Sequence, residues 1–267
     1  MSFLDDAVAA SRERVAEAQR LVPLDVLRTR AQALPPAPSL VDALRAPGLS
    51  VIAEVKRSSP SRGRMVEIPD PAALAAAYVA GGASAVSVLT EPRWFDGSLD
   101  DLVAVAAAVD VPVLRKDFTV DAYMVWEARA AGAAAVLLIV AALSDAHISG
   151  FLRTADDAGM DALVEVHDPD ETARAVKAWT HAGTGRPLIL GINARDLTSL
   201  QVDPERFAEV VKALPEQAIA VAESGVMGPD SVRHLPGLGA DAVLVGEYVA
   251  TSPDPAAAVR GLVEAGA

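Results

Sequence analysis

The chain contains no cysteine, and this absence removes several classes of chemistry at once. Disulfides, thiolate nucleophiles and Cys-ligated zinc or iron–sulfur centres are all excluded. Aromatic residues are also scarce, at 4% of 267 residues, although 52% of the chain is hydrophobic. The interior must therefore be built mainly from Ala, Val and Leu, and there is enough apolar material for one large core.

Positive charge is in short supply, because 23 Lys and Arg stand against 36 Asp and Glu and leave a net charge of -13. Nucleic-acid-binding proteins usually carry a basic face, so we expect no nucleic acid as a partner. Long apolar runs are missing too: the longest, at about residues 130–144, is too short to cross a bilayer. The charged N-terminus lacks the apolar segment of a signal peptide, and we expect a cytoplasmic protein that binds no membrane. A small anionic ligand in a locally basic pocket stays compatible with this charge.

The first 45 residues predict helix. Phe3, Leu4, Val8 and Val15 recur at helical spacing among charged residues, and a Pro-rich stretch at 34–38 interrupts the pattern. No strand signal occurs in this segment. We therefore expect an N-terminal helical extension over residues 1–45, packed on a catalytic domain over residues 46–267.

From Leu49 onward one unit repeats: a short, apolar, β-branched run ends in a polar residue, and an Ala-rich helix follows. Eight runs can be counted: Ser50–Lys56, Ala85–Thr90, Val111–Lys116, Ala134–Val140, Ala162–Val166, Leu188–Asn193, Ile219–Glu223 and Ala242–Gly246. Strands this uniformly apolar are buried on both faces, which favours a parallel sheet covered by helices. The pattern predicts an α/β protein with one closed (β/α)8 barrel, the TIM barrel.

Helix boundary signals lie between these runs. Capping residues predict helix starts at Asp70-Pro71, Asp121, Ser144, Asp168-Pro169, Asp203-Pro204, Pro229-Asp230 and Asp254-Pro255. Glycines predict helix ends at Ala80-Gly81-Gly82, Ala131-Gly132 and Ala158-Gly159.

The chemistry of such barrels lies at the carboxyl ends of the strands. The residues at those ends are Glu54, Lys56, Lys116, Asp117, Glu165, Asn193, Arg195, Glu223, Ser224, Gly246 and Glu247. Charged residues inside apolar strands are costly to bury unless they are paired. One reading is a ring of structural ion pairs across the barrel mouth. The other, favoured because two lysines and three glutamates converge on one rim, is a set of general acids and bases.

Small residues after the last two strands, at Ser224-Gly225 and Gly246, allow backbone N–H groups to approach a phosphate. Either glycine alone can serve a tight turn, but the pair, within reach of Lys56, favours phosphate binding. The basic segment from Lys56 to Gly63 follows the first strand. It is either a solvated loop or a mobile lid over an anionic substrate.

At these residues the sequence resembles the indole-3-glycerol phosphate synthase family. The resemblance covers essentially the whole chain and falls in order on every strand. The matching stretches are Ile52–Gly63, Ser87–Glu91, Phe95 with Gly97-Ser98, Leu114–Phe118, Val136–Val140, Leu163–His167, Gly191–Asn193, Arg195–Leu197, Ala222–Gly225 and Leu244–Glu247.

The resemblance implies ring closure, decarboxylation and dehydration of 1-(2-carboxyphenylamino)-1-deoxyribulose 5-phosphate to indole-3-glycerol phosphate, a step of tryptophan biosynthesis. It implies a monomer and no metal or other cofactor. Carried over by position, Lys116 is the general acid at the substrate carbonyl and Glu165 is the base. Glu54 and Lys56 assist the acid–base steps, and Asn193 and Glu223 orient Glu165 and the substrate. Substrate-binding positions would be Ser224, Gly225, Gly246 and Glu247 for phosphate, Ser59 and Arg195 for the carboxylate, and Phe95, Phe118 and Leu197 for the aromatic ring.

The chemistry agrees with these roles. An aryl carbon is a poor nucleophile, so protonation of the carbonyl by an ammonium helps, and we expect surrounding cations and apolar walls to make Lys116 acidic. Whether Lys56 or Lys116 is the acid in the dehydration stays open. His147, His167, His181 and His234 are scattered, and we interpret all four as structural or surface residues.

Two positions depart from the family pattern. Ala194 replaces a small polar residue and could loosen the rim of the sixth strand. The stretch 179–187 is longer and more polar than the usual connection.

Three rival functions are weighed. The pathway isomerase on the same fold uses a cysteine base, which this chain lacks. A Schiff-base enzyme would use Lys116 as a nucleophile and would be trapped by borohydride. A non-catalytic phosphosugar-binding barrel has no need for Lys116, Glu165 and Glu54 together.

Overall fold

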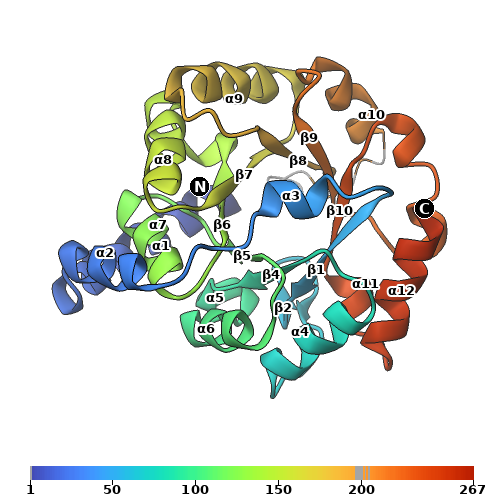
Figure 1. Cartoon of the computed structure of the whole chain (residues 1–267), viewed down its shortest axis with the longest axis horizontal. Helices are drawn as coiled ribbons and strands as arrows, with labels where there is room; N and C mark the ends of the chain where they lie inside the picture. The colour runs from blue at the N-terminus through green and yellow to red at the C-terminus, as the bar shows by residue number, and fades with distance from the viewer. Residues whose placement is uncertain (1, 196–200, 202, 204) are drawn as a thin grey trace.

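Eight parallel strands close into a barrel in the computed structural model, which describes residues 2–195, 201, 203 and 205–267 (Figure 1). The strands are β1 (Ser50–Val55), β4 (Ala85–Leu89), β5 (Val113–Lys116), β6 (Ala135–Ile139), β7 (Asp161–Val166), β8 (Ile189–Asn193), β9 (Ile219–Glu223) and β10 (Ala242–Val245). They pair in chain order, and β10 closes the ring on β1. The predicted (β/α)8 fold is confirmed, with strand bounds close to the predicted runs.

Helices surround the barrel (Figure 1). They are α4 (Pro71–Ala80), α5 (Pro92–Phe95), α6 (Leu99–Ala108), α7 (Ala122–Ala130), α8 (Asp145–Asp157), α9 (Pro169–Ala182), α10 (Arg206–Val210), α11 (Glu247–Ala250) and α12 (Pro255–Ala265). Short 3-10 turns are η1 (Val140–Ala142), η2 (Val211–Ala213), η3 (Pro229–Ser231) and η4 (Pro236–Leu238). None of the helices among the described residues is long and apolar enough to cross a membrane.

Five predicted helix starts are confirmed by their caps, since the side chains of Asp70, Asp121, Ser144, Asp168 and Asp254 each accept a backbone N–H of the first turn. Two predicted starts differ from the structure. The helix expected at Asp203-Pro204 is present but begins at Arg206, and the Asp203 side chain accepts the N–H of Glu205 at 3.0 Å. The helix expected at Pro229-Asp230 is only a 3-10 turn, and Pro236 interrupts the segment that follows it.

The alternation of side chains along the strands decides what faces the barrel interior. Ile52, Leu114, Leu163 and Val221 belong to one buried interior cluster, separate from the cluster that faces the helices. Because strand side chains repeat with a period of two, the next inward positions are Glu54, Lys116, Glu165 and Glu223. The apolar layer therefore supports a layer of charged side chains at the carboxyl end of the barrel.

The N-terminal segment forms three helices, α1 (Phe3–Leu21), α2 (Leu24–Ala33) and α3 (Leu40–Leu44). The break at Val22-Pro23 was not predicted. The segment lies along α7, where the Tyr123 hydroxyl donates to the carbonyl of Val22 at 2.9 Å and the Arg28 guanidinium lies over Trp126. The division between residues 1–45 and 46–267 stays a prediction.

The helix α3 covers the amino end of the barrel, in front of the strands in Figure 1. Asp161, at the start of β7, accepts the backbone N–H groups of Leu40 and Val41 at 2.8 and 3.2 Å. The same carboxylate accepts from Arg186 at 2.9 Å, and Arg186 also pairs with Asp156. The polar stretch 179–187 thus has a structural role, because its arginine anchors two carboxylates at this end.

We expect Asp161→Ala to lower the free energy of unfolding by about 2–4 kcal/mol, because it leaves two N–H groups and a guanidinium without their buried partner. Urea denaturation measures the change. The control is Asp156→Ala, which removes a partner of the same arginine at a carboxylate that is 35% exposed, and should cost less than about 1 kcal/mol. Equal losses in the two variants would contradict this account of how α3 is held.

Candidate active site

A cavity of about 530 Å³ opens at the carboxyl end of the barrel. All the predicted site residues that the structure describes line it: Glu54, Lys56, Ser59, Phe95, Lys116, Phe118, Glu165, Asn193, Arg195, Glu223, Ser224, Gly225, Gly246 and Glu247. Leu197 lies outside the described residues. The cavity has the size of ordinary small-molecule sites. The predicted residues are thus brought together, while their individual roles stay predictions.

The Lys116 ammonium lines this cavity beside two carboxylates. Its Nζ donates to Oε2 of Glu223 and lies 3.5 Å from Oε2 of Glu165. Burial by itself would lower the pKa of Lys116, but the carboxylates of Glu223, Glu165 and Glu54 outweigh it and raise that pKa above its ordinary value. The expectation of an acidic Lys116 is therefore wrong, because the groups nearest to it are anions.

The two carboxylates on either side of Lys116 respond differently to the site. Burial raises the pKa of Glu223 to about 7 despite the attraction of Lys116, and Glu165 adds repulsion. Burial also acts on Glu165, but Lys116, His167 and a hydrogen bond from Asn193 hold its pKa below the usual range. Glu165 is therefore charged at neutral pH, as a general base must be.

Glu54 of β1 and Lys56, directly after this strand, form a second pair. The Lys56 ammonium lies 3.6 Å from Oε1 of Glu54 and 5.9 Å from the ring centre of Phe95. Ser87 donates to the other oxygen of Glu54 at 3.2 Å. A β-carbon at Gly246 would lie 2.6 Å from Oε1 of Glu54, so a larger residue there would displace this carboxylate.

One wall of the cavity is aromatic. The rings of Phe95 and Phe118 lie 6.3 Å apart, and Phe3 packs edge-on against Phe118 at 5.9 Å. Phe3 comes from α1 and was not among the predicted site residues. Its sequence signal, one apolar residue at helical spacing, does not distinguish a cavity wall from ordinary helix packing.

The other side of the cavity is formed by the turns after β8, β9 and β10. Ser224 and Gly225 both adopt positive φ, at 68° and 78°, and the Ser224 hydroxyl donates to Asn193 at 2.8 Å. The backbone N–H of Ala194 donates to the Glu223 carbonyl at 3.0 Å. Ala194 itself therefore stays paired to β9, and no loosening of the rim is seen at this residue.

The basic segment after β1 is a hairpin rather than a plain loop, with β2 (Ser58–Ser59) antiparallel to β3 (Gly63–Arg64). At its base Arg57 contacts Asp101 at 2.5 and 3.1 Å. At its tip Arg62 reaches across the mouth to Oε1 of Glu247 at 2.7 Å. Ser59, Pro60 and Ser61 line the cavity between these two contacts.

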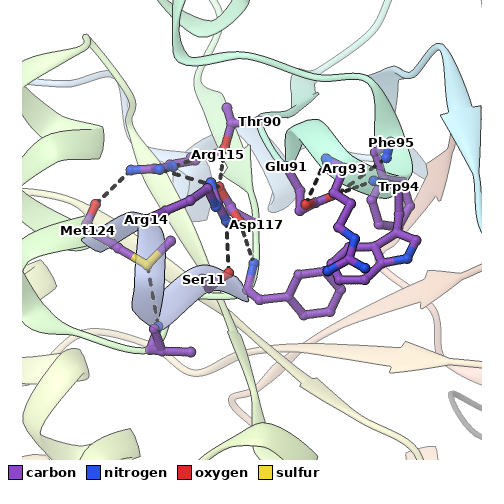
Figure 2. A network of polar contacts seen from close by, with 12 residues as sticks. Ser11, Arg14, Thr90, Glu91, Arg93, Trp94, Phe95, Arg115, Asp117 and Met124 are labelled. Atoms are coloured by element: carbon purple, nitrogen blue, oxygen red, sulfur yellow. Dashed lines mark hydrogen bonds and ion pairs between the residues drawn. The ribbon is translucent and has the colours of Figure 1, made fainter. Parts of the chain in front are cut away.

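A buried polar network holds the strand end that carries Lys116, and Figure 2 shows Asp117 between Arg14 and Arg115. Arg14 of α1 reaches Asp117 at 2.6 and 3.1 Å, and Thr90 donates to it at 2.6 Å. Burial raises the pKa of Asp117, but Arg115 and Arg14 outweigh it and keep the pKa low. The contribution of Arg14 was missed, because an arginine on an amphipathic helix looks like a solvated charge.

Glu91, which lies beside the Asp117 network in Figure 2, accepts the backbone N–H groups of Arg93, Trp94 and Phe95. This carboxylate therefore orients the short helix α5, which presents the Phe95 ring to the cavity.

His167, which we expected to be a structural or surface residue, lies beside Glu165 of the site. Its Nε2 lies 3.5 Å from Oε1 of Glu165 and its Nδ1 lies 3.0 Å from Glu171.

Across the part of the chain that the structure describes, no group of His, Asp and Glu is arranged to hold a metal ion.

Comparisons with known proteins cover the whole chain. The family model described as indole-3-glycerol phosphate synthase matches residues 4–262. A protein of that name from Beutenbergia cavernae is 54% identical over 268 residues, covering 100% of this chain and 97% of the relative. One from Mycolicibacterium smegmatis is 51% identical over 265 residues, covering 99% of this chain and 95% of the relative.

Solved structures with similar folds are more distant in sequence. The 3-hexulose-6-phosphate synthase from Salmonella typhimurium has a TM-score of 0.64 at 15% identity, covering 81% of this chain and 98% of that one. The thiamine phosphate pyrophosphorylase from Pyrococcus furiosus has a TM-score of 0.61 at 18% identity, covering 85% of this chain and 97% of that one. At these identities the similarity supports the barrel fold alone.

We expect Lys116→Met to lower the free energy of unfolding by about 3–5 kcal/mol at pH 8, because it leaves buried carboxylates without their cation. Without that cation the folded-state pKa values of these carboxylates rise, so the cost is present where they ionise and shrinks as pH falls toward 5.5. Urea denaturation at both pH values measures this. The exposed Lys212→Met is the control and should change little. A loss independent of pH would contradict the account.

Proposed function

The chain belongs to the indole-3-glycerol phosphate synthase family, and we propose that Lys116, Glu165 and Glu54 carry the chemistry of that family's reaction here. It is a carbon–carbon lyase that converts 1-(2-carboxyphenylamino)-1-deoxyribulose 5-phosphate to indole-3-glycerol phosphate, a step of tryptophan biosynthesis. The observation that carries the proposal is the Lys116 ammonium between Glu165 and Glu223 in a cavity with one aromatic wall.

The substrate has an aromatic carboxylate at one end and a phosphate at the other, and the two sides of the cavity suit these ends. The anthranilate ring packs between Phe95 and Phe118, with its carboxylate toward Ser59 and Arg195. The phosphate lies against the backbone at Ser224-Gly225 and after Gly246. Glu247 contributes backbone only, because its carboxylate is paired with Arg62 and would repel a phosphate.

Ring closure forms a bond between the aryl carbon that bears the carboxylate and the carbonyl carbon of the sugar. The carbonyl π electrons move to oxygen, which takes a proton from the Lys116 ammonium. A lysine with a raised pKa is a weak acid toward a ketone, but the oxygen becomes strongly basic as the bond forms. The proton therefore moves late in bond formation. The charged lysine is a poor nucleophile, which disfavours a Schiff base.

Decarboxylation breaks the bond between the ring carbon and the carboxylate, and the electrons of that bond restore the aromatic ring. In the dehydration, the hydroxyl made from the carbonyl leaves as water with a proton from Lys56, or from Lys116 after it has regained a proton from solvent. Glu165 takes the proton from the carbon next to nitrogen, which completes the indole. Glu54, hydrogen-bonded by Ser87, holds Lys56 as its charge partner.

The protein acts as a monomer in this proposal, since one chain supplies the aromatic wall, the charged cluster and the phosphate turns of the cavity. Residues 1–45 serve as an extension of the barrel, to which α1 brings Phe3 and Arg14. The substrate of the proposed reaction is a phosphorylated, charged metabolite that does not cross membranes, which supports a cytoplasmic location.

We expect Lys116→Met to reduce the rate of indole formation by at least about 10²–10³-fold, because it removes the proton donor. Indole fluorescence on incubation with the substrate measures the rate. An analogue whose carbonyl is reduced to an alcohol cannot cyclise and should bind this variant within a few-fold of wild type. A variant that keeps full activity would refute the role of Lys116, and inactive wild-type protein would refute the proposed function.

Gly191→Ala should lower kcat about 100-fold, because its β-carbon would lie 2.0 Å from Oε1 of Glu223 and displace the partner of Lys116. The control is Gly150→Ala in α8, where nothing lies within 4 Å of the added carbon. Fluorescence assays and thermal unfolding of both variants separate loss of activity from loss of fold. Wild-type kcat in Gly191→Ala would show that the position of Glu223 does not matter.

A further inference from the structure

His167 follows β7 by one residue and lies two residues beyond Glu165, so both side chains leave the strand on the same face. Its Nε2 is buried, has no hydrogen-bond partner among the described residues and lies 3.5 Å from Oε1 of Glu165. A buried ring nitrogen without a partner is unusual and calls for an explanation.

The opposite side of the ring is held firmly. Oε2 of Glu171 lies 3.0 Å from Nδ1 of His167 and accepts the backbone N–H of the same residue at 2.8 Å. Glu171 is itself fixed in the first turn of α9, where its N–H donates to the Asp168 cap at 2.7 Å. A carboxylate at Nδ1 fixes the proton on that nitrogen and turns Nε2 toward Glu165.

We propose that His167 is a positioning residue for Glu165, with Glu171 behind it, and that its Nε2–H keeps the Glu165 carboxylate oriented and charged while Lys116 is engaged with the substrate. This inference rests on the proposed role of Glu165 as the base.

The need for such a group follows from the charges around Glu165. The Asn193 amide lies 3.1 Å from Oε1 of Glu165, and the Lys116 ammonium lies 3.5 Å from Oε2. Once Lys116 has given its proton to the substrate oxygen, it is a neutral amine. Glu165 then shares a buried site with Glu223, a like charge, and an imidazolium at Oε1 is the cation that still faces it.

Three carboxylates act on His167: Glu165 from β7, Glu171 from α9 and Glu223 from β9. The Lys116 ammonium of β5 lies at the other oxygen of Glu165, 3.5 Å from Oε2. Burial works against the imidazolium, but these carboxylates outweigh it and raise the pKa of His167 above its ordinary value. The imidazolium therefore persists to higher pH than that of an ordinary histidine and is lost as pH rises through this raised pKa. The turnover rate should fall over the same range.

Three variants separate the positioning role from simple helix capping. His167→Gln keeps a neutral donor, and His167→Leu removes the donor. Glu171→Gln keeps an acceptor for the backbone N–H but loses its charge. The matched control is Asp170→Asn, which removes one charge from the exposed face of the same helical turn. The readouts are kcat and KM by indole fluorescence from pH 5.5 to 9, with thermal unfolding of each variant.

We expect KM to change less than about twofold and kcat to fall about 10-fold in His167→Gln and further in His167→Leu. The alkaline fall in kcat should disappear in both variants. In Glu171→Gln that fall should move about one pH unit lower, because the imidazolium loses an anionic neighbour. In Asp170→Asn the alkaline fall in kcat should stay at the same pH as in the wild type.

Titration of the histidine signals by NMR gives a readout besides activity. The His167 signal, identified by its loss in His167→Gln, should titrate about one unit lower in Glu165→Gln and in Glu171→Gln. Wild-type kcat and pH dependence in His167→Gln and Glu171→Gln would overturn the inference. If Glu165→Gln kept its activity, the proposed role of Glu165 would fail instead, so the two failures are distinguishable.

Discussion

The charge balance around Lys116 is the constraint on which the barrel mouth depends. Glu54, Glu165 and Glu223 are each nearly fully buried, and such carboxylates are tolerated only with a cation and hydrogen-bond donors in place. The surroundings are arranged to supply them. Gly191 and Gly246 leave room for carboxylate oxygens where a β-carbon would collide, and Asn193 and Ser87 donate to Glu165 and Glu54.

The same balance connects structure to reactivity. One ammonium is shared between a carboxylate that stays charged and one whose pKa is raised to about 7, so the site holds a base and a readily protonated acid within reach of one lysine. Environments that push neighbouring pKa values apart are typical of acid–base catalysis. The apolar layer of Ile52, Leu114 and Leu163 beneath these groups keeps water from screening them.

Much of the fold and the site could be predicted from the sequence, because both depend on local patterns. A period of two places Glu54, Lys116, Glu165 and Glu223 inward at strand ends, and Asp and Ser caps set most helix starts. A cap residue alone does not predict a helix where the apolar pattern that follows it is broken, as it is after Pro229. The two-residue strands of the hairpin at 58–64 are too short to show any period.

Contacts between distant elements could not be predicted. The role of Phe3 in the cavity and the reach of Arg14 to Asp117 depend on how α1 docks on the barrel, which no local spacing encodes. The basicity of Lys116 was mispredicted for the same reason. Its nearest neighbours come from β7 and β9, and sequence order does not rank their distances.

The Arg14–Asp117 pair also bears on the order of events during synthesis, since its two residues are 103 positions apart. The 19-residue α1 has its own capping box, with Ser2 and Asp5 each accepting a backbone N–H, so it can become helical soon after leaving the ribosome. Its docking site at the end of β5 emerges only after about 100 more residues have been translated. The first helix of the chain can therefore dock only after nearly half of the chain has been translated, and the aromatic wall is completed no earlier than that.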